Sequence, residues 1–268
     1  MSKKDVKEII EHTFDDVASE YDINEYFLIT AQKMVENLEY KENLNILDLS
    51  CGTGNISILL AKKFKTSNII GVDLSASMVE VAQNKAKEKE LTNISFEKAD
   101  VDNLRFDDNS FDIITCGFGL FFYPDMTNSL KNFMKLLKED STFVFSSFTK
   151  EAFTPYSEIF QKTLEEDYGL EYPKGGANFL ETSEQIKELI LSAGNYKYET
   201  VQNDISKRIT LIQWWDTLNS AGYKGMINQL NEEQLKRFKK QHLDDISNLS
   251  KDGLITLSTD TLITTVYR

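Results

Sequence analysis

The sequence predicts a doubly wound α/β fold built on a mostly parallel seven-stranded sheet. Short apolar runs alternate with segments of helical periodicity between residues 45 and 148, and a glycine-rich turn follows the first apolar run. Two further strand-like runs, 196–205 and 261–267, complete the set. Alternation of strand and helix favours parallel pairing, because each crossover helix returns the chain to the same end of the sheet. We also expect an antiparallel edge strand and helical cap insertions.

The elements follow one another in a regular order. Apolar positions recur at helical spacing from Lys3 to Tyr21, and a second helix is predicted from Tyr26 to Leu38. The remaining strands are predicted at 45–49, 68–72, 94–98, 111–116 and 142–148, and the helices at 55–64, 77–89, 124–138 and 183–193.

The regular alternation stops after residue 148. The stretch that follows contains Pro155, Pro173 and the pair Gly175-Gly176, which indicates an irregular or helical insertion with a possible hinge at the glycines. A later polar stretch is predicted to be helical. The expected segments of this one elaborated domain are N-terminal helices over the site (1–40), the core (41–149), a first cap insertion (150–182), a core helix and strand (183–205), a second cap insertion (206–258) and a final strand (259–268).

Composition narrows the classes of partner. The chain has 268 residues, 41% of them hydrophobic, which is enough for one full core. Its formal charge of −13 disfavours nucleic acids and anionic membranes as partners. Cys51 and Cys116 form neither a disulfide framework nor a metal-binding cluster, so no metal is expected. No run approaches the roughly 18 apolar residues of a membrane span, and we expect a cytoplasmic protein of undetermined oligomeric state.

The glycine turn is the first functional signal. Gly52 and Gly54 lie between a strand and a helix, where a bare backbone and free N–H groups suit a nucleotide or a carboxylate. Asp73 follows the next strand at the spacing of a ribose-binding acid. Ser57 stands where a dinucleotide fingerprint requires a third glycine, which disfavours NAD, and no Tyr-x-x-x-Lys pair follows the fifth strand. A plain strand-to-helix turn is the alternative reading.

Several segments in order resemble the class I S-adenosylmethionine-dependent methyltransferases. The resemblance extends from about Phe14 to Phe148 and rests on LDLSCGTGN, GVDLSASMVEVA and KADVDNLRFDDNSFDIITC. The segments CGFGLFFYPD and FDDVASEYD further resemble the ubiquinone and menaquinone C-methyltransferase branch. The resemblance implies a Rossmann-like fold, S-adenosyl-L-methionine as cofactor and methylation of a small molecule.

The resemblance also implies a set of cofactor-binding residues. The first motif would hold the methionine moiety, the acid after the second strand the ribose, and the segment before the fourth strand the adenine amino group. The set is Asp48, Cys51, Gly52 and Gly54 at the methionine, Asp73 at the ribose, Met78, Asp100 and Val101 at the adenine, Tyr21, Gly117 and Phe118 closing over the methionine, with Ser50 and Leu74 beside them.

Ser50 departs from the family pattern, which usually has glycine there. A serine in the β region would fit without strain, whereas a positive φ would be unfavourable for it.

No single side chain is identified as the catalytic group. The methyl group of a sulfonium is already activated, so orientation of an oxygen, nitrogen or carbon acceptor supplies much of the catalysis and a base is not always needed. The candidates are Tyr21, His12, Tyr123 and Tyr156.

Aromatic residues are concentrated in the two insertions, which favours an apolar or aromatic acceptor and leaves a cationic amine open. The rings are Phe153, Tyr156, Phe160, Tyr168, Tyr172, Phe179, Trp214, Trp215 and Tyr223. A non-catalytic cofactor-binding or regulatory module is the alternative function.

Overall fold

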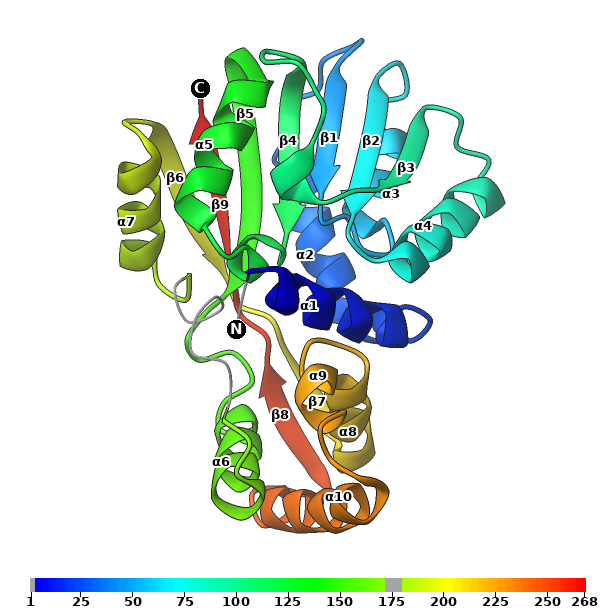
Figure 1. Ribbon diagram of the computed structural model, residues 1–268, viewed down its shortest axis with the longest axis vertical. Helices are drawn as coiled ribbons and strands as arrows, with labels where there is room; N and C mark the ends of the chain where they lie inside the picture. The colour runs from blue at the N-terminus through cyan, green and yellow to red at the C-terminus, as the bar shows by residue number, and fades with distance from the viewer. Residues whose placement is uncertain (1–2, 172–179) are drawn as a thin grey trace.

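A central seven-stranded sheet organises the molecule, shown in the computed structural model of Figure 1, which describes residues 3–171 and 180–268. The strand order is β3-β2-β1-β4-β5-β9-β6. The strands are β1 (Asn45–Leu49), β2 (Asn68–Asp73), β3 (Ile94–Lys98), β4 (Phe111–Gly117), β5 (Leu137–Phe148), β6 (Lys197–Asn203) and β9 (Thr261–Tyr267).

Helices cover both faces of this sheet and form a second, smaller lobe below it (Figure 1). The helices are α1 (Lys3–Val17), α2 (Glu25–Glu36), α3 (Asn55–Lys63), α4 (Ala76–Glu88), α5 (Met126–Leu136), α6 (Tyr156–Tyr168), α7 (Ser183–Ala193), α8 (Leu211–Asn219), α9 (Lys224–Ile227) and α10 (Glu232–Ser247), with 3₁₀ turns η1 (Tyr21–Ile23), η2 (Val101–Asn103) and η3 (Leu120–Phe122).

The predicted fold class is confirmed. All neighbouring strands from β3 to β5 pair in parallel, and the antiparallel strand is β9, which pairs with both β5 and β6. The antiparallel strand therefore lies one position inside the edge strand β6. The carboxyl ends of β1, β2 and β4 meet at one edge, where ligands bind in open α/β sheets.

Two-sided burial explains why the strands are continuous apolar runs. Ile46 belongs to a buried cluster with residues of α2 and α3 on one face, whereas the next residue, Leu47, belongs to the cluster on the other face, which includes residues of α5, and both are fully buried. Ile113 and Ile114 divide between the faces in the same way. Successive strand side chains point to opposite faces, so a sheet covered on both sides requires apolar residues at every position.

The smaller lobe contains a feature that the sequence analysis did not anticipate. Its polar stretch is mostly helical, as expected, but it begins and ends in strands that pair as a two-stranded antiparallel sheet, β7 (Ser206–Thr210) with β8 (Leu254–Ser258). The register joins Ser206 to Ser258, across more than 40 intervening residues. A pairing so distant leaves no turn signal, and in β7 only Ile209 is buried, so local alternation is weak.

Aromatic side chains form the interior of the smaller lobe. Trp214, Phe160, Phe238 and His242 are fully buried there. The indole N–H of Trp214 donates to Nε2 of His242 at 2.9 Å, and Phe238 stacks on the imidazole with ring centroids 5.4 Å apart. Nδ1 of His242 finds no partner within the described part of the chain. Burial lowers the pKa of His242 to about 4.

No helix within residues 3–171 and 180–268 is long and apolar enough to cross a membrane. Over the same residues, no three His, Cys, Asp or Glu side chains gather in a way that could hold a metal ion.

The buried imidazole predicts how stability changes with pH. The folded-state pKa of about 4 lies below the ordinary value of about 6.5, so the unfolded chain binds more protons between these values. The contribution of the neutral ring to the free energy of unfolding is complete above pH ~6.5. It is lost as the pH falls towards 4, and the total loss is about 3 kcal/mol. Urea unfolding measured at pH ~7.5 and ~4.5 should show that His242→Gln loses less of its free energy of unfolding between these pH values than the wild type does.

The matched control is His12→Gln, at an exposed side chain, which should keep the wild-type profile. Equal losses in the wild type and His242→Gln would contradict the assignment of this pH dependence to the buried ring.

Candidate functional site

A pocket opens at the carboxyl ends of β1, β2 and β4, beneath α1. Its empty space amounts to about 680 Å³, part of which is open to solvent. Ten of the thirteen predicted ligand-binding residues line it: Tyr21, Ser50, Gly52, Asp73, Leu74, Met78, Asp100, Val101, Gly117 and Phe118. These residues come from five separate segments, so the fold brings the predicted set together.

The glycine turn is built from left-handed residues. Ser50, Gly52 and Gly54 have φ values of 49°, 53° and 80°. The more favourable of the two expectations for Ser50, a β-region backbone, is therefore wrong. The turn must reverse direction within a few residues between β1 and α3, and this leaves Ser50 in a conformation that suits glycine. Its hydroxyl bonds with the Tyr123 hydroxyl at 2.7 Å, which helps to hold the strained residue.

Two predicted residues support the turn and do not line the pocket. The buried carboxylate of Asp48 accepts hydrogen bonds from Thr115 on β4, at 2.7 Å, and from Ser57 on α3, and burial raises its pKa to about 6. A Cβ at Gly54 would lie 3.0 Å from both Ala82 and Phe96, so this glycine permits close packing of α3, α4 and β3. Both residues act below the ligand surface.

Asp73 connects the turn to the end of β2. Its Oδ2 accepts the N–H of Gly52 at 2.8 Å, and its Oδ1 accepts the N–H of Ser75 at 2.9 Å. Burial raises the pKa of this carboxyl. A carboxylate offers about four lone-pair positions and the residue lines the pocket, so a hydroxyl donor of a ligand can still bind it.

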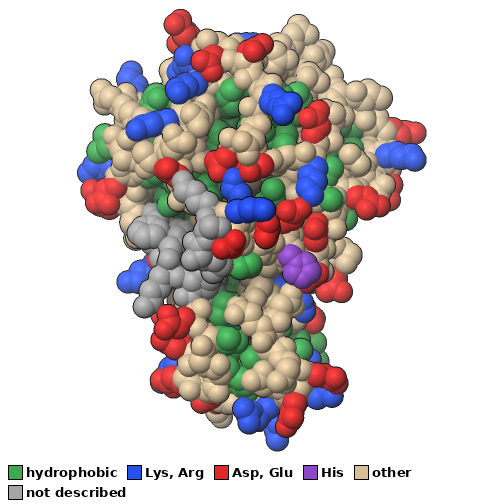
Figure 2. Space-filling model, in the orientation of Figure 1, with side chains coloured by type: hydrophobic (Ala, Val, Ile, Leu, Met, Phe, Trp, Pro, Cys, Tyr) green, Lys and Arg blue, Asp and Glu red, His purple; other side chains and the backbone are tan. Residues whose placement is uncertain are grey.

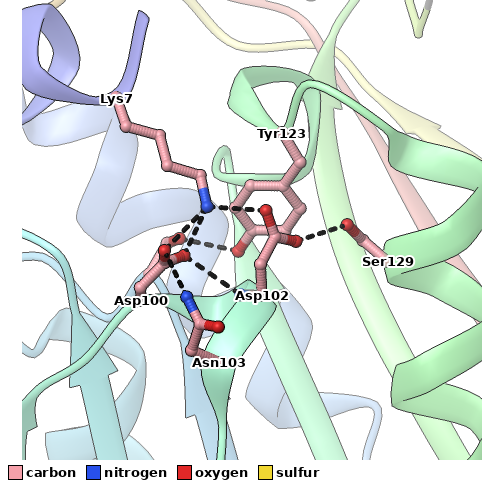
Figure 3. Close-up of polar contacts among 7 residues, drawn as sticks. Lys7, Asp100, Asp102, Asn103, Tyr123 and Ser129 are labelled. Atoms are coloured by element: carbon pink, nitrogen blue, oxygen red, sulfur yellow. Dashed lines mark hydrogen bonds and ion pairs between the residues drawn. The ribbon is translucent and has the colours of Figure 1, made fainter. Parts of the chain in front are cut away.

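Asp100 also lines the pocket and has a partner from α1. Figure 3 shows the Lys7 ammonium between the carboxylates of Asp100 and Asp102, at 2.7 and 2.6 Å. Sequence periodicity gave Lys7 no role, because a lysine on an amphipathic helix resembles a solvated residue.

The N-terminal segment is fastened over the pocket by further polar contacts. Asp15 accepts from the Ser75 hydroxyl at 2.5 Å and from the N–H of Ser77 at 3.0 Å. Asp22 accepts from Thr53 at 2.7 Å and pairs with Lys85 at 2.7 Å. These contacts tie α1 and η1 to the turns after β1 and β2, so the segment forms a roof over the pocket.

A smaller pocket adjoins the first between the glycine turn and α2. Cys51 lines it, together with Tyr21 and Thr30. The Thr30 hydroxyl is fully buried and has no hydrogen-bond partner among the described residues. An unpaired buried hydroxyl is unfavourable, so this atom suits a polar ligand group. The sequence gave no signal for Thr30, since its isolated hydroxyl lies within an amphipathic helix.

The structure separates the four catalytic candidates. Tyr21 and Tyr123 line the main pocket, and burial raises the pKa of both. His12 is exposed on α1 near Asp16 and does not reach the pocket. Tyr156 is buried in the smaller lobe with its ring 5.8 Å from Trp214, so it is also outside the pocket.

The predicted aromatic cover also needs correction. Phe160, Trp214 and Tyr223 pack mainly against one another and their neighbours in the smaller lobe, because a lobe of this size needs large side chains for its own core. The rings that line the pocket are instead Phe14, Tyr21, Phe118, Phe122 and Tyr123. Tyr172, Phe179 and Gly175-Gly176 lie outside the described residues.

The left-handed backbone of Ser50 predicts that glycine at this position is more stabilising than alanine, the opposite of the order usual in regular structure. Ser50→Gly and Ser50→Ala both remove the hydroxyl, but only glycine relieves the left-handed backbone. We expect Ser50→Gly to be more stable by about 1 kcal/mol in urea unfolding. An alanine variant of equal or greater stability would contradict a left-handed residue 50.

Comparisons with known proteins agree with this geometry. A family profile described as a methyltransferase domain matches residues 40–208, more than half of the chain. The demethylmenaquinone methyltransferase of Staphylococcus carnosus is 30% identical over 197 residues, which cover 71% of this chain and 79% of that protein.

Two solved structures share the fold. YcgJ from Bacillus subtilis has a TM-score of 0.61 at 22% identity and covers 90% of this chain and 98% of its own. Phosphoethanolamine N-methyltransferase 2 from Haemonchus contortus, in complex with S-adenosyl-L-methionine, has a TM-score of 0.53 at 14% identity and covers 89% of this chain and 52% of its own. The domain match, the relative and the ordered motifs together show that the chain belongs to the class I S-adenosylmethionine-dependent methyltransferases.

Proposed function

We propose that this enzyme methylates a small, apolar or aromatic acceptor in the pocket beneath α1. The observation that carries the proposal is the continuity of that pocket. Its lining includes Asp73 and Asp100, the acids assigned to the cofactor, and the rings of Phe14 and Phe122. A cofactor held by the acids and an acceptor held against the rings would share one space.

The residues present fit S-adenosylmethionine. Asp73 offers free lone pairs for ribose hydroxyls, and Asp100 and Met78 lie on the wall assigned to adenine. The unpartnered Thr30 hydroxyl in the adjoining pocket suits the amino acid end. We assign the cofactor's three parts to these three places.

Catalysis in this site relies on position. The sulfonium cofactor supplies an activated methyl group, so the chain has to align the acceptor with it and keep water away. The roof formed by α1 and η1 would reduce the access of water, and Tyr21 of η1 is held in place by stacking on Phe27, with ring centroids 4.3 Å apart. The Tyr123 hydroxyl is engaged with Ser50, so we assign Tyr123 to shaping the wall.

The acceptor class rests on the apolar side of the pocket. Ile10, Phe14, Phe122 and Pro124 present carbon surface there, which suits a ring or a hydrocarbon better than a charged group. The Staphylococcus carnosus relative is named for demethylmenaquinone, and this favours a quinol-like acceptor. The domain match ends at residue 208, before α8, α9 and α10 of the smaller lobe, so it does not identify the individual acceptor.

The ribose assignment predicts a loss of affinity in Asp73→Asn. The amide keeps the size of the side chain but removes the charged acceptor, which should weaken S-adenosylmethionine binding by about 1.5–3 kcal/mol in calorimetric titration. Asp245→Asn, exposed on α10, removes the same charge far from the pocket and should bind normally. Unchanged affinity in Asp73→Asn would refute the ribose assignment.

The Thr30 assignment predicts a ligand-dependent effect. Thr30→Val should bind S-adenosylhomocysteine about ten-fold more weakly, but should bind 5′-methylthioadenosine, which lacks the amino acid end, as the wild type does. Thr261→Val removes another fully buried, unpartnered hydroxyl outside both pockets and serves as the matched control. Equal weakening for both ligands would show that Thr30 acts through the fold alone.

A turnover assay decides between a methyltransferase and a non-catalytic cofactor-binding module. Incubation with labelled S-adenosylmethionine and a panel of phenols, quinols and amines should transfer label to a ring-containing acceptor. Tight cofactor binding with no transfer to any acceptor would favour the alternative of a non-catalytic binding module.

A further inference from the structure

The carboxylate of Asp100 has no free acceptor position. Its Oδ1 accepts from Lys7 Nζ at 2.7 Å and from the Asp102 N–H at 3.1 Å. Its Oδ2 accepts from Lys7 Nζ at 2.8 Å and from Asn103 Nδ2 at 2.9 Å (Figure 3). A carboxylate offers about four lone-pair positions, so a ligand donor can bind Asp100 only if one of these donors leaves.

Of these three donors, Lys7 comes from a different element and can leave without altering the turn that Asp100 begins. The Asp102 N–H is fixed by the backbone of that turn, and the side-chain amide of Asn103 belongs to the same turn. Lys7 comes from α1 and reaches Asp100 on a flexible side chain. Its ammonium also bonds Asp102 Oδ2 at 2.6 Å, so it keeps a partner after leaving Asp100.

The charge state of Asp100 agrees with its contact to the Lys7 ammonium. Burial would raise the pKa of Asp100, but the hydrogen bonds from Lys7, Asp102 and Asn103 and the charge of Lys7 together outweigh it, so the pKa lies below its ordinary value. Asp100 is therefore a charged acceptor. Without Lys7, the neighbouring carboxylates of Asp100 and Asp102 would carry two uncompensated charges at the pocket wall.

We propose that Lys7 occupies the adenine subsite of the empty enzyme and is displaced on cofactor binding. The adenine amino group takes over an acceptor position on Asp100, and the Lys7 ammonium shifts to Asp102. The inference rests on the proposed function, because it takes Asp100 as the acceptor of the adenine amino group. Lys7 would then be a residue that sets cofactor affinity through an exchange of partners.

The exchange gives binding an unusual dependence on salt. Each binding event has to break the Lys7–Asp100 contact, and added salt weakens such contacts between partly exposed groups. The affinity of the wild type for S-adenosylhomocysteine, a ligand without net charge, should therefore rise with ionic strength. A variant without the ammonium should bind more tightly at low salt and lose this dependence.

The test compares Lys7→Met with Lys98→Met by calorimetric titration with S-adenosylhomocysteine at low and high salt. Lys98 lies at the end of β3 and pairs with Glu11 of α1 at 2.6 Å, and it does not line the pocket. Its removal therefore loosens α1 without freeing Asp100. We expect Lys7→Met to bind about three- to ten-fold more tightly at low salt, with no salt dependence. Lys98→Met and Lys7→Arg should behave as the wild type does.

Any other result contradicts the proposed displacement of Lys7 from Asp100. Unchanged or weaker binding by Lys7→Met would show that Lys7 does not compete with adenine. Tighter binding by both methionine variants would assign the effect to attachment of α1. If the folded wild type binds neither S-adenosylhomocysteine nor S-adenosylmethionine, the proposed function itself fails, which is distinct from a failure confined to Lys7→Met.

Discussion

The left-handed turn between β1 and α3 is the constraint on which the site depends. It is fixed from below by Asp48, whose buried carboxylate joins β1 to Ser57 of α3 and Thr115 of β4. It is fixed from the side by Asp73, which holds the N–H of Gly52. Two carboxylates therefore determine the path of a backbone that has few alternatives, and the positions of the remaining pocket walls follow from it.

Closure of the pocket depends on contacts between distant parts of the chain. The roof formed by α1 and η1 meets the strand ends through Asp15, Asp22 and Lys7, which bind partners at least 31 residues away. Acidic and basic side chains are interspersed on the face drawn in Figure 2. Several acids in this strongly acidic chain thus have structural partners, although composition alone suggested only a charged surface. The same contacts explain how an N-terminal helix without a strand of its own can complete a site at the edge of the sheet.

Local signals allowed much of the fold to be predicted, and long-range contacts explain what was missed. The bounds of β1, β3 and α7 could be read from the sequence, because apolar runs and helical periodicity are local properties. The β7–β8 pairing and the roles of Lys7 and Thr30 depend on partners far away in sequence. Tyr156 resembled a site residue only by composition, since an aromatic ring suits a ligand wall and a lobe interior equally well.

The central claim is that the pocket beneath α1 binds S-adenosylmethionine through this turn. Parallel calorimetric titrations of the purified protein with S-adenosylmethionine and with NADH test it most directly. The account predicts saturable binding of S-adenosylmethionine alone, with a stoichiometry of about one per chain. Binding of NADH alone, or of neither ligand by the folded protein, would contradict it.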